Sequence, residues 1–220
     1  MIEDFDNIPT LPPIFGPARQ VAYIVPDIEA AIEHWHREYG VGLFLLARGA
    51  RPLNGSYYRG ARAQSVAVNI AFAYIGDLQL ELIELIGDTP SMYKEAVDRG
   101  QTGVHHYAVC VEDFPRAYNW ALDNGFDAVV DAGVDGLVRM SYVEHPGSGL
   151  ILEVIQWNPM TRPYFEGIEK RIRNADPGRL VHEFTLQELT PRLALVTQLA
   201  RFGIAKLFGR VQQTRRVGVA

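Results

Sequence analysis

Four polar residues recur at equivalent points of a repeated pattern, and their side chains are ones that bind metal ions. Gln20 opens an apolar segment at 20–27, and His106 opens a similar segment at 106–113. Glu81 and Glu153 each lie inside a later apolar segment of their own half. An amide oxygen, an imidazole and two carboxylates form a mixed N/O donor set that suits Zn, Ni, Co, Fe or Mn, with water completing the shell. The sequence therefore predicts one divalent metal site with two ligands from each half.

The repeat also predicts the elements that position these residues. At one constant offset, the two halves align Ala22 with Ala108, Val25 with Val111, and Asp27 with Asp113. Each copy shows a short apolar strand, a capping Asp, a helical run and further strands, the last of which carries the acid. Each half therefore reads as β-α-β-β-β.

Each of the four positions has an ordinary structural explanation when taken alone. A single Glu in a strand is more often on a solvated face, and a single His at a strand start is more often a hydrogen-bonded structural residue. Because side chains alternate along a strand, we expect His105 and His106 to point to opposite faces, as should Glu81 and Glu84. The metal hypothesis depends on the four residues falling at equivalent places in two aligned halves.

Composition and charge exclude several classes of function. The net charge of −5 gives no reason to expect nucleic-acid binding. The single cysteine, Cys110, forms no intrachain disulfide and fits a reducing compartment. Residues 1–6 are acidic and do not resemble a signal peptide, and no apolar run is long enough to span a bilayer. We therefore expect a cytoplasmic protein.

The repeat and its ligand positions resemble the vicinal oxygen chelate superfamily, which includes glyoxalase I, methylmalonyl-CoA epimerase, bleomycin resistance proteins and extradiol dioxygenases. Residues 103–111 and 145–153 are similar to the first strand and the last loop and strand of the epimerase's second module, and 80–90 to the end of the first module. The Gln/Glu/His/Glu order is similar to that of some glyoxalase I enzymes. The resemblance implies an α+β, glyoxalase-like fold, in which two tandem β-α-β-β-β modules form a cup-shaped mixed sheet around the metal.

The chain then divides into three segments. Residues 1–17 are rich in proline and are expected to form an extended arm. Residues 18–157 form the vicinal oxygen chelate domain, with module one at 18–90 and module two at 103–157. Residues 158–220 form a C-terminal extension that ends in a basic amphipathic helix over 191–220. We expect this helix to pack on the domain or to support a homodimer, and we favour contact with an anionic membrane less.

The resemblance implies a metal-dependent isomerase, epimerase or lyase of the glyoxalase type. Its partner would be a small carbonyl substrate (a 2-oxo compound, an acyl-CoA or a hemithioacetal), which reacts through a metal-stabilised, enolate-like intermediate. Glu153 is the expected base and Glu81 its counterpart on the opposite side. We also consider four weaker candidates for substrate contact: Tyr57, Tyr58, Arg59 and Tyr142.

Two other functions stay open at the level of sequence. A metal-free small-molecule binding protein of the same fold would be expected to lack ligand types at these positions, whereas all four remain. An extradiol-type dioxygenase requires two histidines and one carboxylate around Fe(II). Gln20 in place of the first histidine and Glu81 as a fourth ligand both count against oxygen chemistry.

Overall fold

The computed structural model describes residues 12–52, 55–101, 103–134 and 138–185. The elements of module one are β1 (Ala18–Ile24), α1 (Ile28–Tyr39), β2 (Phe44–Ala50), β5 (Ala67–Ile75) and β6 (Leu78–Ile86). Those of module two are β7 (Val104–Val111), α3 (Phe114–Asp123), β8 (Asp127–Val134), β9 (Val138–His145) and β10 (Leu150–Gln156). The other elements are a 3-10 turn (Pro13–Phe15), β3 (Tyr57–Tyr58), β4 (Ala61–Arg62), α2 (Met92–Asp98), α4 (Arg162–Asn174) and β11 (Val181–Glu183).

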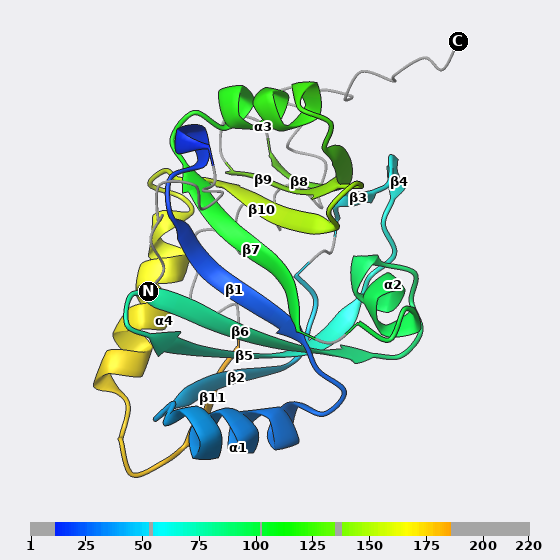
Figure 1. Cartoon of the computed structure of the whole chain (residues 1–220). Coiled ribbons are helices and arrows are strands. Elements are labelled where there is room, and N and C mark those ends of the chain that lie inside the picture. Colours follow the sequence, from blue (N-terminus) through cyan, green and yellow to red (C-terminus); the bar gives the residue numbers. More distant parts are fainter. Residues whose placement is uncertain (1–11, 53–54, 102, 135–137, 186–220) are drawn as a thin grey trace, which may run out of the picture.

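The two modules join along their first strands. Across the described residues the strands form one mixed sheet, in the order β11-β2-β5-β6-β1-β7-β10-β9-β8-β3-β4. β1 runs antiparallel to β7, and each of these strands pairs in parallel with the last strand of its own module, β6 or β10. This symmetric order, visible in Figure 1, confirms the predicted pair of β-α-β-β-β modules.

Each module helix begins at the predicted aspartate and covers the outer face of its half. The Asp27 carboxylate accepts a hydrogen bond from the Ala30 N–H, and that of Asp113 accepts one from the Arg116 N–H. These bonds satisfy N–H groups that the first helical turn leaves unpaired. Figure 1 shows α1 and α3 on opposite outer sides of the sheet, where each helix buries its apolar side against its own module.

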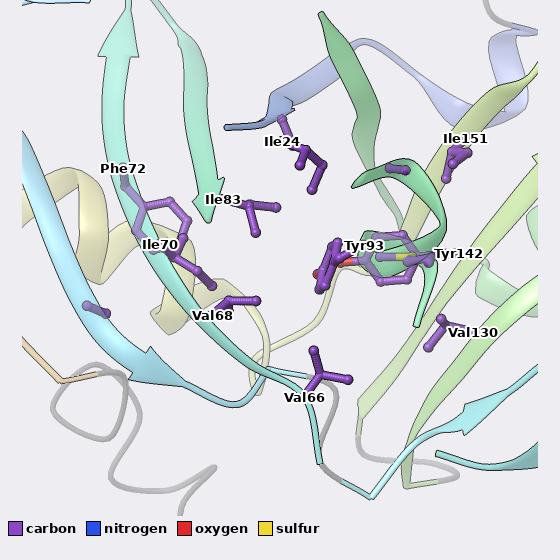
Figure 2. Close-up of a cluster of buried hydrophobic side chains, with 14 of the residues drawn as sticks. Ile24, Val66, Val68, Ile70, Phe72, Ile83, Tyr93, Val130, Tyr142 and Ile151 are labelled. Carbon is purple, nitrogen blue, oxygen red and sulfur yellow. The ribbon is translucent and has the colours of Figure 1, made fainter. Parts of the chain in front are cut away.

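The inner faces of the two modules share a single apolar cluster, drawn in Figure 2. Phe72 and Ile83 come from module one, whereas Val130, Tyr142 and Ile151 come from module two. Two further helices add side chains to the same cluster: α2 contributes Met92, Tyr93 and Ala96, and α4 contributes Tyr164, Ile168 and Ile172. The inside of the cup is therefore packed with apolar groups, and any polar group there is held in a low-dielectric environment.

The loop of module one, between β2 and β5, and the C-terminal extension add strands and a helix to the two repeated modules. Within that loop, β3 crosses to module two and pairs with β8. At the opposite end of the sheet, β11 pairs in parallel with β2, after α4 has packed against β2 and β5. The basic helix expected over 191–220 lies outside the described residues. None of the described helices has the length and the apolar run that crossing a bilayer would take.

Candidate functional site

Two buried alanines bring the predicted ligands together on the inner face of the sheet. Ala22 on β1 pairs with Glu81 on β6 and with His106 on β7. Residues paired across neighbouring strands project from the same face, so the acid and the imidazole meet above a methyl group. Ala108 in module two has the equivalent place between Glu153 and Gln20. All four predicted ligands therefore share one face of the sheet.

His106 lies between the two acids. Its Nε2 atom is 3.5 Å from Glu81 Oε2 and 3.5 Å from Glu153 Oε2. The imidazole is 1% exposed and the carboxylates 8% and 6%, so the three groups are buried together. At 3.5 Å, each contact is longer than a normal hydrogen bond of about 2.7–3.2 Å. Accordingly, Nε2 is buried without a hydrogen-bond partner.

The electrostatics of this trio follow from its burial. Burial by itself lowers the pKa of His106, but polar contact with Glu153 and Glu81, together with their negative charges, raises it to about 9. Burial raises the pKa of the Glu81 carboxyl, while His106 opposes that shift. A positive charge between the two carboxylates is thus strongly favoured, whether it is a proton or a metal ion.

The prediction that His105 points away from His106 is wrong. The register between β1 and β7 shifts at this point, because Ala22 pairs with His106 whereas Tyr23 pairs with Val104. Such a bulge re-aims the extra residue of a strand. His105 is also buried, and its Nδ1 atom lies 2.9 Å from Nδ1 of His106. The alternation rule fails here because it assumes an unbroken ladder.

Gln20 is buried on the same face, but its amide is engaged elsewhere. Its Nε2 donates a hydrogen bond to Gln79 Oε1 at 2.8 Å, and Gln79 in turn donates to the Tyr74 hydroxyl at 2.9 Å. The carbonyl oxygen of Gln20 is not used in this bond. The structure therefore brings Glu81, His106 and Glu153 together, whereas Gln20 lies on the same face with its amide nitrogen bonded to Gln79.

Three tyrosines enclose the acids. Tyr142 pairs with Glu153 across β9 and β10, and its ring centroid is 5.1 Å from that of His106. Figure 2 shows Tyr142 beside Tyr93 of α2. The pKa of each phenol, including that of Tyr164 on α4, is well above the ordinary value, first through burial and then through the charges of Glu153 and Glu81. Tyr93 and Tyr164 lie outside the equivalent positions of the repeat, so the sequence pattern does not point to them.

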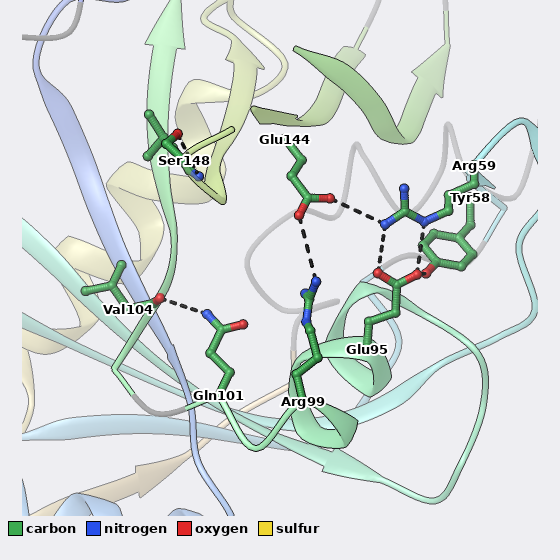
Figure 3. A network of polar contacts seen from close by, with 9 residues as sticks. Tyr58, Arg59, Glu95, Arg99, Gln101, Val104, Glu144 and Ser148 are labelled. Atoms are coloured by element: carbon green, nitrogen blue, oxygen red, sulfur yellow. Dashed lines mark hydrogen bonds and ion pairs between the residues drawn. The ribbon is translucent and has the colours of Figure 1, made fainter. Parts of the chain in front are cut away.

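Two of the remaining substrate candidates, Tyr58 and Arg59, belong to a separate polar network, shown in Figure 3. The Tyr58 hydroxyl donates a hydrogen bond to Glu95 of α2, and Arg59 contacts the same carboxylate at 2.9 and 2.7 Å. Arg59 also lies 3.4 Å from Glu144 of β9. Tyr57 is exposed on β3. This network ties the loop of module one to α2 and to module two.

The residues present fit a metal by donor type and by spacing. Two ligands bound at about 2.0–2.2 Å from a tetrahedral or octahedral ion are about 3.0–3.5 Å apart, which matches the separation of His106 Nε2 from each carboxylate. As the side chains now stand, the described residues contain no group of three or more His, Cys, Asp or Glu that could hold an ion. The two results differ because the 3.5 Å distances describe two separate pairs, His106 with Glu81 and His106 with Glu153, whereas a metal site requires three side chains to converge.

The trio is buried: the His106 side chain is fully enclosed and the two carboxylates are nearly so. Surface hollows lie elsewhere, one between α3 and the 3-10 turn and another beside α1 and β11. The candidate site is covered by the inner cluster, to which Tyr93 and Ile168 contribute from α2 and α4.

Two β-α-β-β-β modules that share one sheet, with two acids and a histidine on its inner face, are the features of a glyoxalase-like protein. A comparison with known protein families gives the same class. The family model of the glyoxalase/bleomycin resistance protein/dioxygenase superfamily matches residues 19–140. The chain belongs to this superfamily.

Three solved structures are similar to this chain at low sequence identity. Methylmalonyl-CoA epimerase from Mycobacterium tuberculosis is 18% identical, with a TM-score of 0.49, over 66% of this chain and 91% of that one. A variant of the Streptomyces coelicolor epimerase in complex with 2-nitronate-propionyl-CoA is 18% identical, with a TM-score of 0.47, over 64% and 94%. A hypothetical protein from Bacillus halodurans C-125 is 17% identical, with a TM-score of 0.48, over 64% and 94%. Comparison with curated proteins yields no match.

Proposed function

We propose that this chain is a divalent-metal-dependent isomerase, epimerase or lyase that moves a proton next to the carbonyl group of a small substrate. One observation supports this proposal above all: a buried histidine nitrogen without a hydrogen-bond partner lies 3.5 Å from each of two buried carboxylates. Buried acids are costly unless they are paired or bound to a cation. A stable fold alone does not require such a trio, so we infer that it serves chemistry.

His106, Glu81 and Glu153 would hold the ion, and the carbonyl oxygen of Gln20 would be the fourth ligand. When bound, a divalent metal acts as a Lewis acid that polarises a carbonyl oxygen and makes a neighbouring C–H group more acidic. The oxygen-rich donor set is compatible with Zn, Ni, Co, Mn and Fe. That oxygen takes no part in the bond between Gln20 and Gln79.

Glu153 is the proposed base. It lies on the same face of the sheet as Tyr142, with which Glu153 pairs across β9 and β10. Glu81 lies on the other side of His106, so two acids flank the same point of the cup. One carboxylate can remove a proton from a substrate held between them and the other can return it, which is the requirement of an isomerase or epimerase. The apolar walls exclude water and so keep the removed proton from exchanging.

The proposal is tested by turnover on 2-oxo, acyl-CoA and hemithioacetal substrates. Glu153→Gln keeps the size of the side chain but removes the base. We expect it to lower turnover by about 10²–10⁴-fold while the fold is unchanged by circular dichroism. The matched control is Glu84→Gln, on the same strand as Glu81, where the acid bonds to Asn69 instead. Full activity of Glu153→Gln on an identified substrate would contradict the assignment of the base.

A further inference from the structure

The bulge in β7 places a second histidine against the candidate ligand. His105 and His106 are 2% and 1% exposed, and their Nδ1 atoms are 2.9 Å apart. The two rings are nearly perpendicular, at 82°. The ring of His105 is also packed against Tyr93 of α2, at 5.5 Å between centroids. The contact between the histidines is thus fixed from two sides.

This contact determines where the proton of His106 lies. Two nitrogen atoms 2.9 Å apart form a hydrogen bond only if one of them carries hydrogen and the other accepts it. A histidine that offers Nε2 to a metal ion carries its proton on Nδ1 and usually donates that proton to a neighbouring acceptor. Here the acceptor within reach is Nδ1 of His105. His106 Nε2 is then free to face Glu81 and Glu153.

The arrangement has a cost that an apolar residue would avoid. With Nδ1 of His105 as the acceptor, its remaining hydrogen is on Nε2, and that atom is buried without a hydrogen-bond partner. An unsatisfied buried donor costs about 1–3 kcal/mol. A leucine would fill similar space without this penalty. What the His105 imidazole provides and a leucine would not is therefore the Nδ1 atom, which can accept a hydrogen bond from His106.

We propose that His105 is a positioning residue, which fixes the tautomer and the ring orientation of His106 so that Nε2 faces the two carboxylates. The inference rests on the proposed function, because it concerns the same site. The inference assigns a role to His105, which is outside the predicted ligand set. It also explains the β-bulge, which brings His105 next to His106.

The test compares Zn²⁺ affinity, measured by competition with a chromogenic chelator, among purified full-length variants. We expect His105→Leu to weaken binding by about 10–100-fold, the usual effect of losing a hydrogen-bond partner of a metal-bound histidine. His105→Asn should stay within a few-fold of wild type, because its side-chain oxygen can accept in place of Nδ1. His34→Leu, at an exposed position on α1, is the control and should not change the affinity.

A second measurement needs no substitution. In the zinc-loaded wild-type protein, two-bond NMR correlations assign the tautomer of each histidine, and we expect a proton on Nδ1 of His106 and none on Nδ1 of His105. Equal zinc affinity of wild type and His105→Leu, or a proton on Nδ1 of His105, would overturn this inference alone. A wild-type protein that binds none of Zn²⁺, Ni²⁺, Co²⁺, Mn²⁺ and Fe²⁺ would overturn the proposed function as well.

Discussion

At the scale of single residues, the main feature of the site is that two negatively charged carboxylates are buried. Glu81 and Glu153 are both removed from water, and His106 lies between them. A proton on the imidazole partly compensates the carboxylates, which is why the pKa of His106 is raised to about 9. A divalent ion would compensate them more fully and would displace that proton. Proton binding and metal binding therefore compete for one place.

The first prediction concerns the metal-stripped protein. The pKa of His106 rises from 6.5 to about 9 on folding, so its stabilising effect is complete below pH 6.5 and is lost as the pH rises through about 9. His106→Gln removes this titration but leaves Glu81, Glu153, His105 and Tyr142 around it. We expect the melting temperature of wild type to exceed that of the variant at low pH, and the difference to shrink across this window.

Thermal melts at a series of pH values measure that difference. A gap that stays constant from about pH 6 to pH 10 would show that folding does not raise the pKa of His106.

At the scale of elements, the strands place the acids and the alanines leave room for them. Ala22 and Ala108 are fully buried, and each lies between two candidate ligands. The outer face of the same sheet carries its own alanine, Ala73, which packs in the cluster under α1. A larger side chain on the inner face would separate the ligands, whereas one on the outer face would disturb only packing.

We therefore expect Ala22→Leu to abolish metal binding. Overpacking should destabilise this variant by about 1–3 kcal/mol, and Ala73→Leu by a similar amount. The difference between them should appear in Zn²⁺ affinity, measured on folded protein at low temperature. Tight zinc binding by Ala22→Leu, or loss of zinc binding in both variants alike, would show that the buried alanines of the inner face do not position the ligands.

The elements also show what the sequence could and could not predict. The internal repeat was enough to predict the two modules, the capping roles of Asp27 and Asp113, and the inward acids, because strand periodicity and helix caps are local signals. The bulge at His105 and the bond between Gln20 and Gln79 depend on how β1 meets its neighbours. Such long-range pairing leaves no mark on sequence periodicity.

At the scale of the whole molecule, segments far apart in sequence close the cup. Arg59 links the loop of module one to Glu95 of α2 and Glu144 of module two. On the other side, α4 buries Ile168 completely against the inner cluster. Because the two modules, α2 and α4 share one apolar cluster, we expect the described part of the chain to unfold as a single cooperative unit.

Ile168→Ala tests this cooperativity. Truncating a fully buried isoleucine should lower the free energy of unfolding by about 2–5 kcal/mol. Urea unfolding, followed by hydrogen exchange at β6 and β10, should show one transition shifted to lower urea in both modules. Glu166→Ala, at an exposed position of the same helix, should change stability by less than about 0.5 kcal/mol. Separate transitions for the two strands would contradict a shared core.

The central claim is that His106 and the two acids hold a divalent metal. It is tested most directly by elemental analysis of the purified protein and of the His106→Ala/Glu153→Ala double variant, after incubation with Zn, Ni, Co, Mn and Fe(II). We predict close to one bound ion per wild-type chain and none in the variant. A wild-type protein that stays metal-free under all these conditions, or a variant that retains its metal, would contradict the claim.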